Sequence, residues 1–162
     1  EQQAYEHSSW APNVYVKIPK PYTKKQSCCD LVSKLSHAGI KVNVTAILTL
    51  PQVEEISAAL CPKVPSYVSV FAGRIADTGR NPVPIMSRCV ELLKKVDAAE
   101  LIWASPRELL NIIQANDIGC HIITVTPDLI GKLKLVGYDL EEYSLDTVKM
   151  FYNDALSAGY KI

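Results

Sequence analysis

Hydrophobic residues along the chain alternate between short β-branched runs and longer segments with helical spacing. The short runs predict buried strands at 14–19, 40–46, 67–72, 101–104 and 120–125. The longer segments predict helices at 23–38, 51–60, 84–96, 106–115, 127–135 and 144–158, after a polar start at 1–12 that can end a further helix. This alternation is typical of a parallel sheet with right-handed crossover connections.

Glycine, proline and capping residues mark the predicted boundaries. Pro51 opens a helix where its missing N–H does least harm. Ser105, Pro106 and Glu108 form the pattern of a capping box at the start of the helix at 106–115. Residues 73–84 are rich in glycine and proline and are predicted to form a loop.

Two α/β architectures fit this pattern of five βα units in 162 residues. One is a complete five-stranded, doubly wound sheet of the flavodoxin type. The other is part of a (β/α)8 TIM barrel, which typically takes about 250 residues. The pattern alone favours the doubly wound sheet.

Composition excludes several classes of function. Lys plus Arg and Asp plus Glu are 17 each, so a net charge of zero gives no reason to expect nucleic acid or an anionic membrane as partner. The five cysteines and three histidines lack metal-ligand spacing and predict reduced thiols of a cytoplasmic protein rather than a zinc site or a disulfide frame. No hydrophobic run approaches the length of a transmembrane helix.

Lys17 is the first candidate for chemistry, because it lies in the β-branched run at 14–19. We expect it at the carboxyl end of that strand, where parallel α/β proteins bind their ligands. In partly desolvating surroundings a lysine gains free amine, which can attack a carbonyl to form a Schiff base. The alternative is an ordinary lysine whose ammonium reaches solvent at the edge of the sheet.

Small polar or cationic residues follow each of the other predicted strands. Two arginines at one edge of the sheet would suit a phosphate group, since guanidinium forks match phosphate oxygens. Surface ion pairs remain the alternative for the arginines, internally hydrogen-bonded strand residues for Asn43 and Thr45, and a helix cap for Ser105. The residues are Asn43 and Thr45, Ser69 and Arg74, Ser105 and Arg107, and Thr124 and Thr126.

Six strings spread over the chain resemble the transaldolase family in sequence, order and spacing, from about residue 11 to the C-terminus. They are VKIP at 16–19, NVT at 43–45, SVFAGRI at 69–75, WASPRE at 103–108, IITVT at 122–126 and YSLDTVKMFY at 143–152. The resemblance implies a (β/α)8 barrel, here the last five βα units and a C-terminal helix in one N-terminally incomplete domain over 1–162. It also implies an enzyme without metal or organic cofactor.

The reaction implied by the resemblance belongs to the pentose phosphate pathway. A dihydroxyacetone unit passes from sedoheptulose 7-phosphate to glyceraldehyde 3-phosphate through a lysine Schiff base, which gives erythrose 4-phosphate and fructose 6-phosphate. Lys17 matches the Schiff-base lysine, Thr45 would help hold the catalytic water, and Asn43 would bind substrate hydroxyls. Arg74 and Arg107 would hold the sugar phosphate, with Ser69 and Ser105 nearby. The full-length protein is expected to form a homo-oligomer, and a mostly apolar stripe on the last helix would cover the barrel or contact another subunit.

Two departures from the family pattern change the expectation. Three earlier strands that carry acidic groups have no counterpart here, because Asp30, Glu54, Glu55 and Asp77 fall in predicted helices or loops. General acid–base groups commonly contribute about 10²–10⁴-fold, so we expect this chain alone to turn over slowly or not at all. Phe71 stands where the related fructose-6-phosphate aldolases have a tyrosine, which favours transfer over cleavage. A non-enzymatic phosphate-binding α/β module is the remaining alternative.

Overall fold

A computed structural model describes residues 1–20 and 27–161. The first residues of the helix predicted at 23–38 lie outside the described part. The chain divides into two compact units, 1–125 and 126–162, which are described separately. None of the helices in the described residues is long and apolar enough to cross a membrane. The prediction of a single domain over 1–162 stays a prediction.

The first unit is built on a five-stranded parallel sheet whose strands follow one another in sequence order. A doubly wound sheet reverses its strand order at a switch point, and this sheet has no reversal. The strand order therefore rules out the flavodoxin-type alternative and confirms the α/β, barrel-type arrangement. The strands are β1 (Val16–Pro19), β2 (Val42–Ile47), β3 (Ser66–Val70), β4 (Ala99–Trp103) and β5 (Ile122–Ile123).

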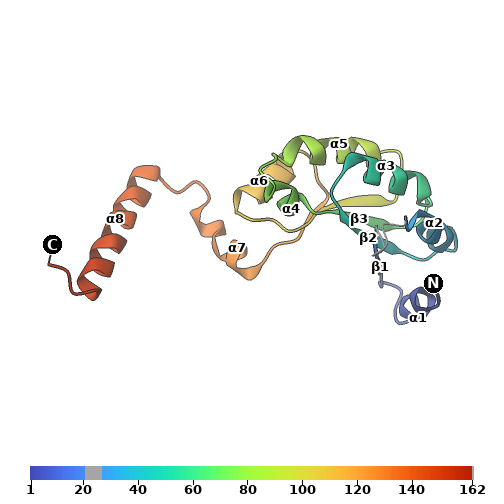
Figure 1. The fold of residues 1–162 in the computed structure, drawn as a ribbon, viewed down its shortest axis with the longest axis horizontal. Coiled ribbons are helices and arrows are strands. Elements are labelled where there is room, and N and C mark those ends of the chain that lie inside the picture. The colour runs from blue at the N-terminus through green and yellow to red at the C-terminus, as the bar shows by residue number, and fades with distance from the viewer. Residues whose placement is uncertain (21–26, 162) are drawn as a thin grey trace. The chain divides into compact units, whose positions relative to one another are not determined.

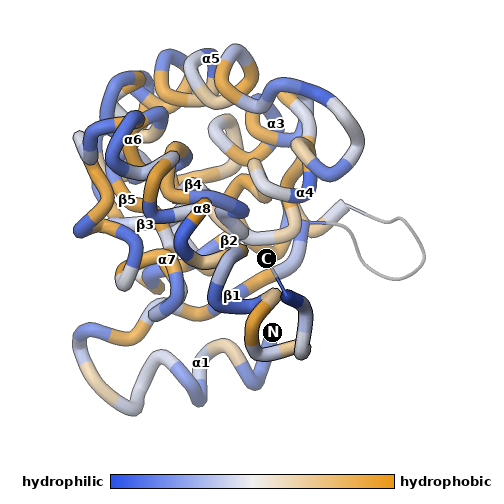
Figure 2. The backbone as a smooth tube through the Cα atoms, turned by 90° about the vertical axis from the view of Figure 1, so that its left-hand side faces the viewer, coloured by the Kyte–Doolittle hydropathy of each residue, from blue (hydrophilic) through white to orange (hydrophobic). Residues whose placement is uncertain are grey.

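Helices connect successive strands of this unit, and three of them form one layer against the sheet (Figure 1). In this layer α2 packs beside α3, and α3 packs beside α5. The turns of α5 alternate between hydrophobic and hydrophilic residues, as expected of a helix with one face on a core (Figure 2). The helices are α1 (Gln2–Ser8), α2 (Cys29–His37), α3 (Leu50–Ala59), α4 (Ala72–Ala76), α5 (Val83–Leu93) and α6 (Leu110–Asp117).

Side chains alternate between the two faces of the sheet, and the faces differ in chemistry. The apolar face carries buried aliphatic residues that pack with the helices, among them Val16, Ile18, Val44, Val68 and Leu101. The opposite side, here called the polar face, carries Lys17, Asn43, Thr45, Tyr67, Ser69 and Glu100. One set of strands therefore separates a hydrophobic core from a polar surface.

Three details of the first unit differ from expectation. The loop predicted at 73–84 begins with the short helix α4, and β5 has only two residues. The helix predicted from Pro106 starts instead at Leu110, so the Ser105 capping box is wrong. Ser105 has a φ of 58°, a left-handed conformation that is uncommon outside glycine. A residue with that φ lacks the extended backbone of an N-cap.

The second unit consists of α7 (Pro127–Gly131), a 3₁₀ turn (Leu133–Leu135) and α8 (Leu140–Ser157). The last helix begins four residues earlier than expected, since Asp139 caps it by accepting hydrogen bonds from the Glu141 and Glu142 backbone N–H groups. No side chain of α8 is buried. Its predicted apolar residues, such as Val148 and Phe151, are therefore exposed.

Candidate active site

Lys17 lies in β1 as expected, but its surroundings differ from expectation. It is the second residue of the strand rather than its last, and its side chain is exposed. Its strand partner in the parallel register is Asn43. Within the described residues, its ammonium makes no hydrogen bond or ion pair. A cavity of about 260 Å³ that includes Lys17 lies between β1 and α1.

Asn43 offers a defined hydrogen-bonding group next to Lys17. The Ser69 hydroxyl donates a 2.8 Å hydrogen bond to the Asn43 Oδ1 atom. Because the oxygen is engaged, the amide is oriented with its Nδ2 hydrogens available as donors. An amide fixed in this way can donate to a hydroxyl or carbonyl oxygen of a ligand, while Ser69 itself is buried.

Thr45 sits at an irregularity in the sheet. Between Val44 and Ile47 the register of β2 against β3 shifts by one residue, and Ala46 has a φ of 60°. Such bulges re-aim side chains and are common beside active sites. The Thr45 side chain is buried, and its Oγ1 atom has no hydrogen-bond partner among the described residues. A buried hydroxyl without a partner is costly, so this position is suited to a water molecule or a ligand oxygen.

Arg74 and Phe71 come together at the carboxyl end of β3. Phe71 is the residue that precedes α4, and the Arg74 guanidinium lies 5.4 Å from the centre of its ring. This contact is favourable, because the face of an aromatic ring attracts a cation. It also gives Phe71 a structural role, that of a platform for the arginine.

Gly73 brings the segment after β3 into direct contact with the segment after β4. A Cβ atom on Gly73 would lie 1.4 Å from the Ser105 carbonyl oxygen and 3.1 Å from the Arg107 Nε atom. The Gly73 N–H also donates to the Ala104 carbonyl, at 3.3 Å. Only glycine permits this approach, and it sets the Arg107 side chain beside the residue that precedes Arg74.

Arg107 is held at both its backbone and its side chain. The buried Asn111 side chain accepts hydrogen bonds from the backbone N–H groups of Arg107, at 2.8 Å, and Glu108, at 3.2 Å. The guanidinium donates to Asp77, from Nε to Oδ1 at 3.0 Å and from Nη2 to Oδ2 at 2.5 Å. Asn111 thus supplies the capping bonds that the sequence pattern assigned to Ser105.

Tyrosines and a carboxylate lie on the polar face near the amino ends of the strands. Tyr15 and Tyr67 stack with ring centres 4.2 Å apart, and Tyr67 pairs with Glu100 across the sheet. Burial raises the pKa of Tyr15 to about 12, with further contributions from Tyr67 and the Glu100 charge. Tyr15 therefore stays protonated at neutral pH.

The buried lysine of this region is Lys20, which follows β1. Its Nζ atom forms an ion pair with Glu55 and donates to the Ser27 hydroxyl at 3.2 Å. Burial opposes the charge, but the hydrogen bond and the charge of Glu55 outweigh it and raise the pKa of Lys20. The same hydrogen bond lowers the pKa of Glu55. A lysine held in its charged form is a poor nucleophile.

Three of the five cysteines, Cys28, Cys89 and Cys120, are poor candidates for nucleophilic chemistry. All five are free thiols. Burial raises the pKa of Cys28 to about 11 and that of Cys89 to about 12, and it also raises the pKa of Cys120. Over residues 1–20 and 27–161, no group of His, Cys, Asp and Glu side chains gathers in a way that could hold a metal ion.

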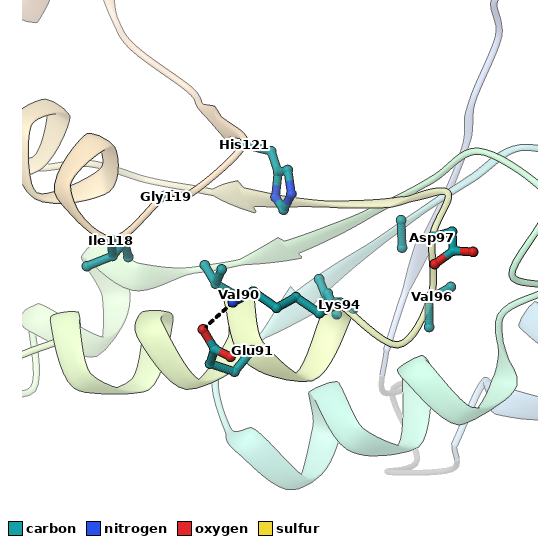
Figure 3. A pocket seen from close by; sticks show the side chains of 10 residues that line it. Val90, Glu91, Lys94, Val96, Asp97, Ile118, Gly119 and His121 are labelled. Carbon is teal, nitrogen blue, oxygen red and sulfur yellow. Dashed lines mark hydrogen bonds and ion pairs between the residues drawn. The ribbon is translucent and has the colours of Figure 1, made fainter.

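A separate cavity of about 460 Å³ lies at the opposite end of the sheet (Figure 3). It reaches Ala99, the first residue of β4, and His121, whose Nδ1 accepts the Leu101 N–H at 3.1 Å. The ion pair between Lys94 and Glu91, 2.7 Å long, borders it. This cavity is distinct from the candidate site, which lies on the polar face and at the carboxyl ends of β3 and β4.

The structure thus groups the predicted residues into two sets. Lys17, Asn43, Thr45 and Ser69 share the polar face, and Phe71, Arg74, Ser105 and Arg107 lie at the carboxyl ends of β3 and β4. Three residues were missed as site residues: Gly73, Asp77 and Asn111. Gly73 was visible inside the string at 69–75, but the contacts of Asp77 and Asn111 depend on loop conformation.

A parallel sheet whose strands follow one another in sequence order, with polar and cationic residues at its carboxyl ends, is the arrangement found in β/α barrels. The family described as Transaldolase/Fructose-6-phosphate aldolase matches residues 2–161. The chain belongs to this family.

Individual relatives agree with this assignment. Probable transaldolase 2 of Listeria monocytogenes serovar 1/2a is 35% identical over 127 residues, which are 78% of this chain and 55% of the relative. Probable transaldolase of Dehalococcoides mccartyi is 34% identical over 125 residues, 76% of this chain and 54% of the relative. Probable transaldolase of Thermoanaerobacter sp. (strain X514) is 31% identical over 163 residues, 99% of this chain and 69% of the relative. The chain therefore spans about half the length of the first two.

Proposed function

We propose that this chain carries the Schiff-base lysine and the phosphate site of a transaldolase. The reaction is transfer of a dihydroxyacetone unit from sedoheptulose 7-phosphate to glyceraldehyde 3-phosphate. The observation that carries the proposal is the arrangement of the polar face, where Lys17 pairs in register with the oriented amide of Asn43. Family membership supports this proposal, since the strings that hold these residues resemble the family pattern.

In the proposed reaction the Lys17 amine adds to the ketone carbonyl carbon of the donor sugar, and water leaves to give the iminium. Cleavage of the bond between C3 and C4 sends its electron pair into the iminium, the C4 hydroxyl loses its proton, and the aldose product departs. The resulting enamine then adds to the acceptor aldehyde, whose oxygen takes up a proton. Hydrolysis of the new iminium returns the amine and releases the ketose product.

Different polar residues would support different steps of this reaction. Asn43 would offer its N–H donors to sugar hydroxyls, and the Thr45 hydroxyl, which has no hydrogen-bond partner among the described residues, would hold the water that moves protons. Arg74 and Arg107 lie on two segments that meet at Gly73 and would provide two cations for one phosphate. No matched general base lies within these 162 residues, so we propose that the chain alone forms the Schiff base but turns over slowly.

Reductive trapping tests this proposal. The chain is treated with fructose 6-phosphate and borohydride, and the modified residue is located by mass spectrometry. We expect a stable adduct on Lys17, its loss in Lys17→Arg, and its retention in Lys41→Arg, which changes a lysine that flanks β2. Absence of an adduct in the full-length protein would refute the Schiff-base chemistry. Phosphate binding without any adduct would favour the non-enzymatic phosphate-binding module.

The proposal also specifies that the dihydroxyacetone unit is transferred to an acceptor rather than released by cleavage. Phe71 has no hydroxyl that could position a water for protonation of the enamine, and its ring is covered by Arg74. We therefore propose that the enamine waits for an acceptor aldehyde. Efficient release of free dihydroxyacetone by the full-length protein without an acceptor would contradict this.

We also propose that the full-length protein self-associates. The exposed apolar residues of α8, which include Leu140 with 80% of its surface accessible, are suited to a subunit contact. Sedimentation of the full-length protein tests this: an oligomer is expected, and a monomer at micromolar concentration would contradict it.

A further inference from the structure

The contact between Asp77 and Arg107 is bidentate. Asp77 immediately follows α4, and both of its carboxylate oxygens accept hydrogen bonds from the guanidinium, at 3.0 Å from Nε and at 2.5 Å from Nη2. The two residues are 30 positions apart in sequence, so the contact depends on the fold. Paired bonds of this kind fix the plane of a guanidinium as well as its position.

Stability is a weak explanation for this ion pair. About half of each side chain is accessible, at 48% for Arg107 and 51% for Asp77. Exposed pairs of this kind contribute only about 0–1 kcal/mol, because solvent screens them and both side chains lose freedom. What the geometry does provide is a fixed orientation of the Arg107 guanidinium.

The orientation leaves one edge of the guanidinium open. A guanidinium has N–H donors on Nε, Nη1 and Nη2, and Asp77 takes the edge formed by Nε and Nη2. The donors on Nη1 and on the outer side of Nη2 form the other fork. That second fork can bind two oxygens of a phosphate group in the same plane.

Other contacts bring the same two segments together. Asn111 holds the Arg107 backbone, and Gly73 contacts the Ser105 carbonyl so closely that no Cβ would fit. Arg74 and Asp77 lie three positions apart at the end of α4, so one short segment supplies both a phosphate-binding cation and the carboxylate that holds the other cation.

We propose that Asp77 is a positioning residue for phosphate recognition: it holds Arg107 with the Nη1 and Nη2 fork toward the phosphate of the sugar substrate. This inference rests on the proposed function, because it takes Arg107 as a phosphate ligand. Asp77 touches neither the phosphate nor the reacting atoms. Its effect passes entirely through the guanidinium.

Two consequences of removing the carboxylate oppose each other. Without Asp77, the site gains net positive charge, which would strengthen attraction of any anion. Without Asp77, Arg107 also loses its fixed orientation and must be ordered again when phosphate binds. The positioning role requires the second effect to exceed the first, so the direction of the change in affinity is diagnostic.

Titration of the chain with inorganic phosphate measures this direction. Asp77→Asn keeps the size of the side chain but removes the charge and one of the two acceptor oxygens. We expect phosphate to bind about tenfold more weakly to this variant, equivalent to about 1.4 kcal/mol. Asp97→Asn, in the turn between α5 and β4 at the other end of the sheet, removes the same charge as a control and leaves the affinity unchanged.

Reductive trapping supplies a second measurement that separates phosphate recognition from the amine chemistry. Dihydroxyacetone has the ketone but no phosphate, whereas fructose 6-phosphate has both. In Asp77→Asn we expect the fructose 6-phosphate concentration for half-maximal adduct on Lys17 to rise about tenfold. The maximal adduct, and the whole titration with dihydroxyacetone, stay as in the unchanged chain.

Each outcome decides a separate question. Tighter or unchanged phosphate binding in Asp77→Asn would overturn the positioning role, and so would an equal loss of adduct with both sugars. Absence of an adduct in the unchanged full-length protein would overturn the proposed function instead, while the phosphate titration would still report on Asp77. Circular dichroism and the unfolding midpoint of Asp77→Asn establish that the variant is folded, and Asp77→Glu, which keeps the charge, is expected to recover part of the lost affinity.

Discussion

Lys17 and Lys20 lie three residues apart at the same edge of the sheet and have opposite environments. Lys20 is buried and paired with Glu55 on α3, and its pKa is raised despite the cost of burial. Lys17 is exposed on the polar face beside Asn43. Burial by itself would select Lys20 as the unusual lysine. The comparison teaches that an ion pair holds a lysine in its charged form and gives it a structural role, whereas a lysine without such a pair remains available to a ligand.

The same division extends over the whole sheet. Residues on the apolar face pack with the helices, and residues on the polar face have hydrogen-bonding groups directed away from that core. Because neighbouring residues of a strand point to opposite faces, single substitutions at adjacent positions can test the two faces separately.

The largest effect on stability is expected on the apolar face of β4. Leu101→Ala removes a fully buried side chain and should lower the free energy of unfolding by about 2–5 kcal/mol, through lost burial and the cavity left behind. Glu100→Ala changes the next residue, which is exposed on the polar face, and should change it by about 0.5 kcal/mol or less. Urea unfolding compares the two variants, and equal losses would contradict the division into faces.

A substantial but smaller effect is expected where the two loops meet. Gly73→Ala places a Cβ on the Ser105 carbonyl, so the backbone must shift at a cost of about 1–3 kcal/mol. Phosphate affinity should fall with it, because Arg107 moves. Gly131→Ala is the matched control, since a Cβ there meets no atom within 4 Å. A Gly73→Ala protein with unchanged stability and phosphate affinity would show that the close contact is dispensable.

Asn111→Ala tests how the Arg107 backbone is held without changing any charge. Asn111→Ala leaves the backbone N–H groups of Arg107 and Glu108 without their acceptor, which should cost about 1–2 kcal/mol and weaken phosphate binding. Asn111→Asp retains an acceptor oxygen for these N–H groups and should lose much less stability, but it adds a negative charge, so only the stabilities of the two variants are compared. Thermal unfolding makes this comparison, and similar losses of stability in both variants would argue against the hydrogen bonds as the cause.

The smallest effect concerns the pH dependence of the Lys20 pair. The lowered pKa of Glu55 gives stability above its ordinary value of 4.5, which is lost as the pH falls through the lowered pKa. The raised pKa of Lys20 gives stability below its ordinary value of 10.5, which is lost as the pH rises through the raised pKa. Glu55→Gln should lower the unfolding temperature at neutral pH and make its decrease at acidic and at alkaline pH less steep. If a pH series of thermal scans showed both decreases unchanged, this ion pair would be excluded as their source.

Much of the fold could be predicted from local pattern. Periodicity located all five strands and the main helices to within a few residues, because buried strands and amphipathic helices have distinct spacings of apolar residues. The errors fell where local preference and tertiary contact disagree. Ser105 and Pro106 have the composition of a helix start, yet the approach of Gly73 and the Asn111 side chain hold this segment in another conformation.

For the candidate site, too, local sequence pattern predicted one part and tertiary contacts decided the other. Strings that resemble the family pattern predicted Lys17, Asn43, Thr45, Ser69, Arg74 and Arg107 as site residues, because each lies within or shortly after a strand that the hydrophobic pattern defines. Their orientation was beyond the reach of sequence. The register shift that surrounds Thr45 and the hydrogen bond from Ser69 to Asn43 arise between strands distant in the chain.

By itself, the sequence determined the alternation of strands and helices and the family, and it predicted Lys17 with its neighbouring polar groups as the site. These follow from spacing and residue type, which are local properties. The hydrophobic pattern left the choice between a doubly wound and a barrel-type sheet open and the family resemblance implied the barrel, but only the tertiary structure confirmed it, since strand order is a matter of pairing between distant segments. It also turned Asp77 from an acidic loop residue into the partner of Arg107, because contact across 30 positions depends on how the loops pack.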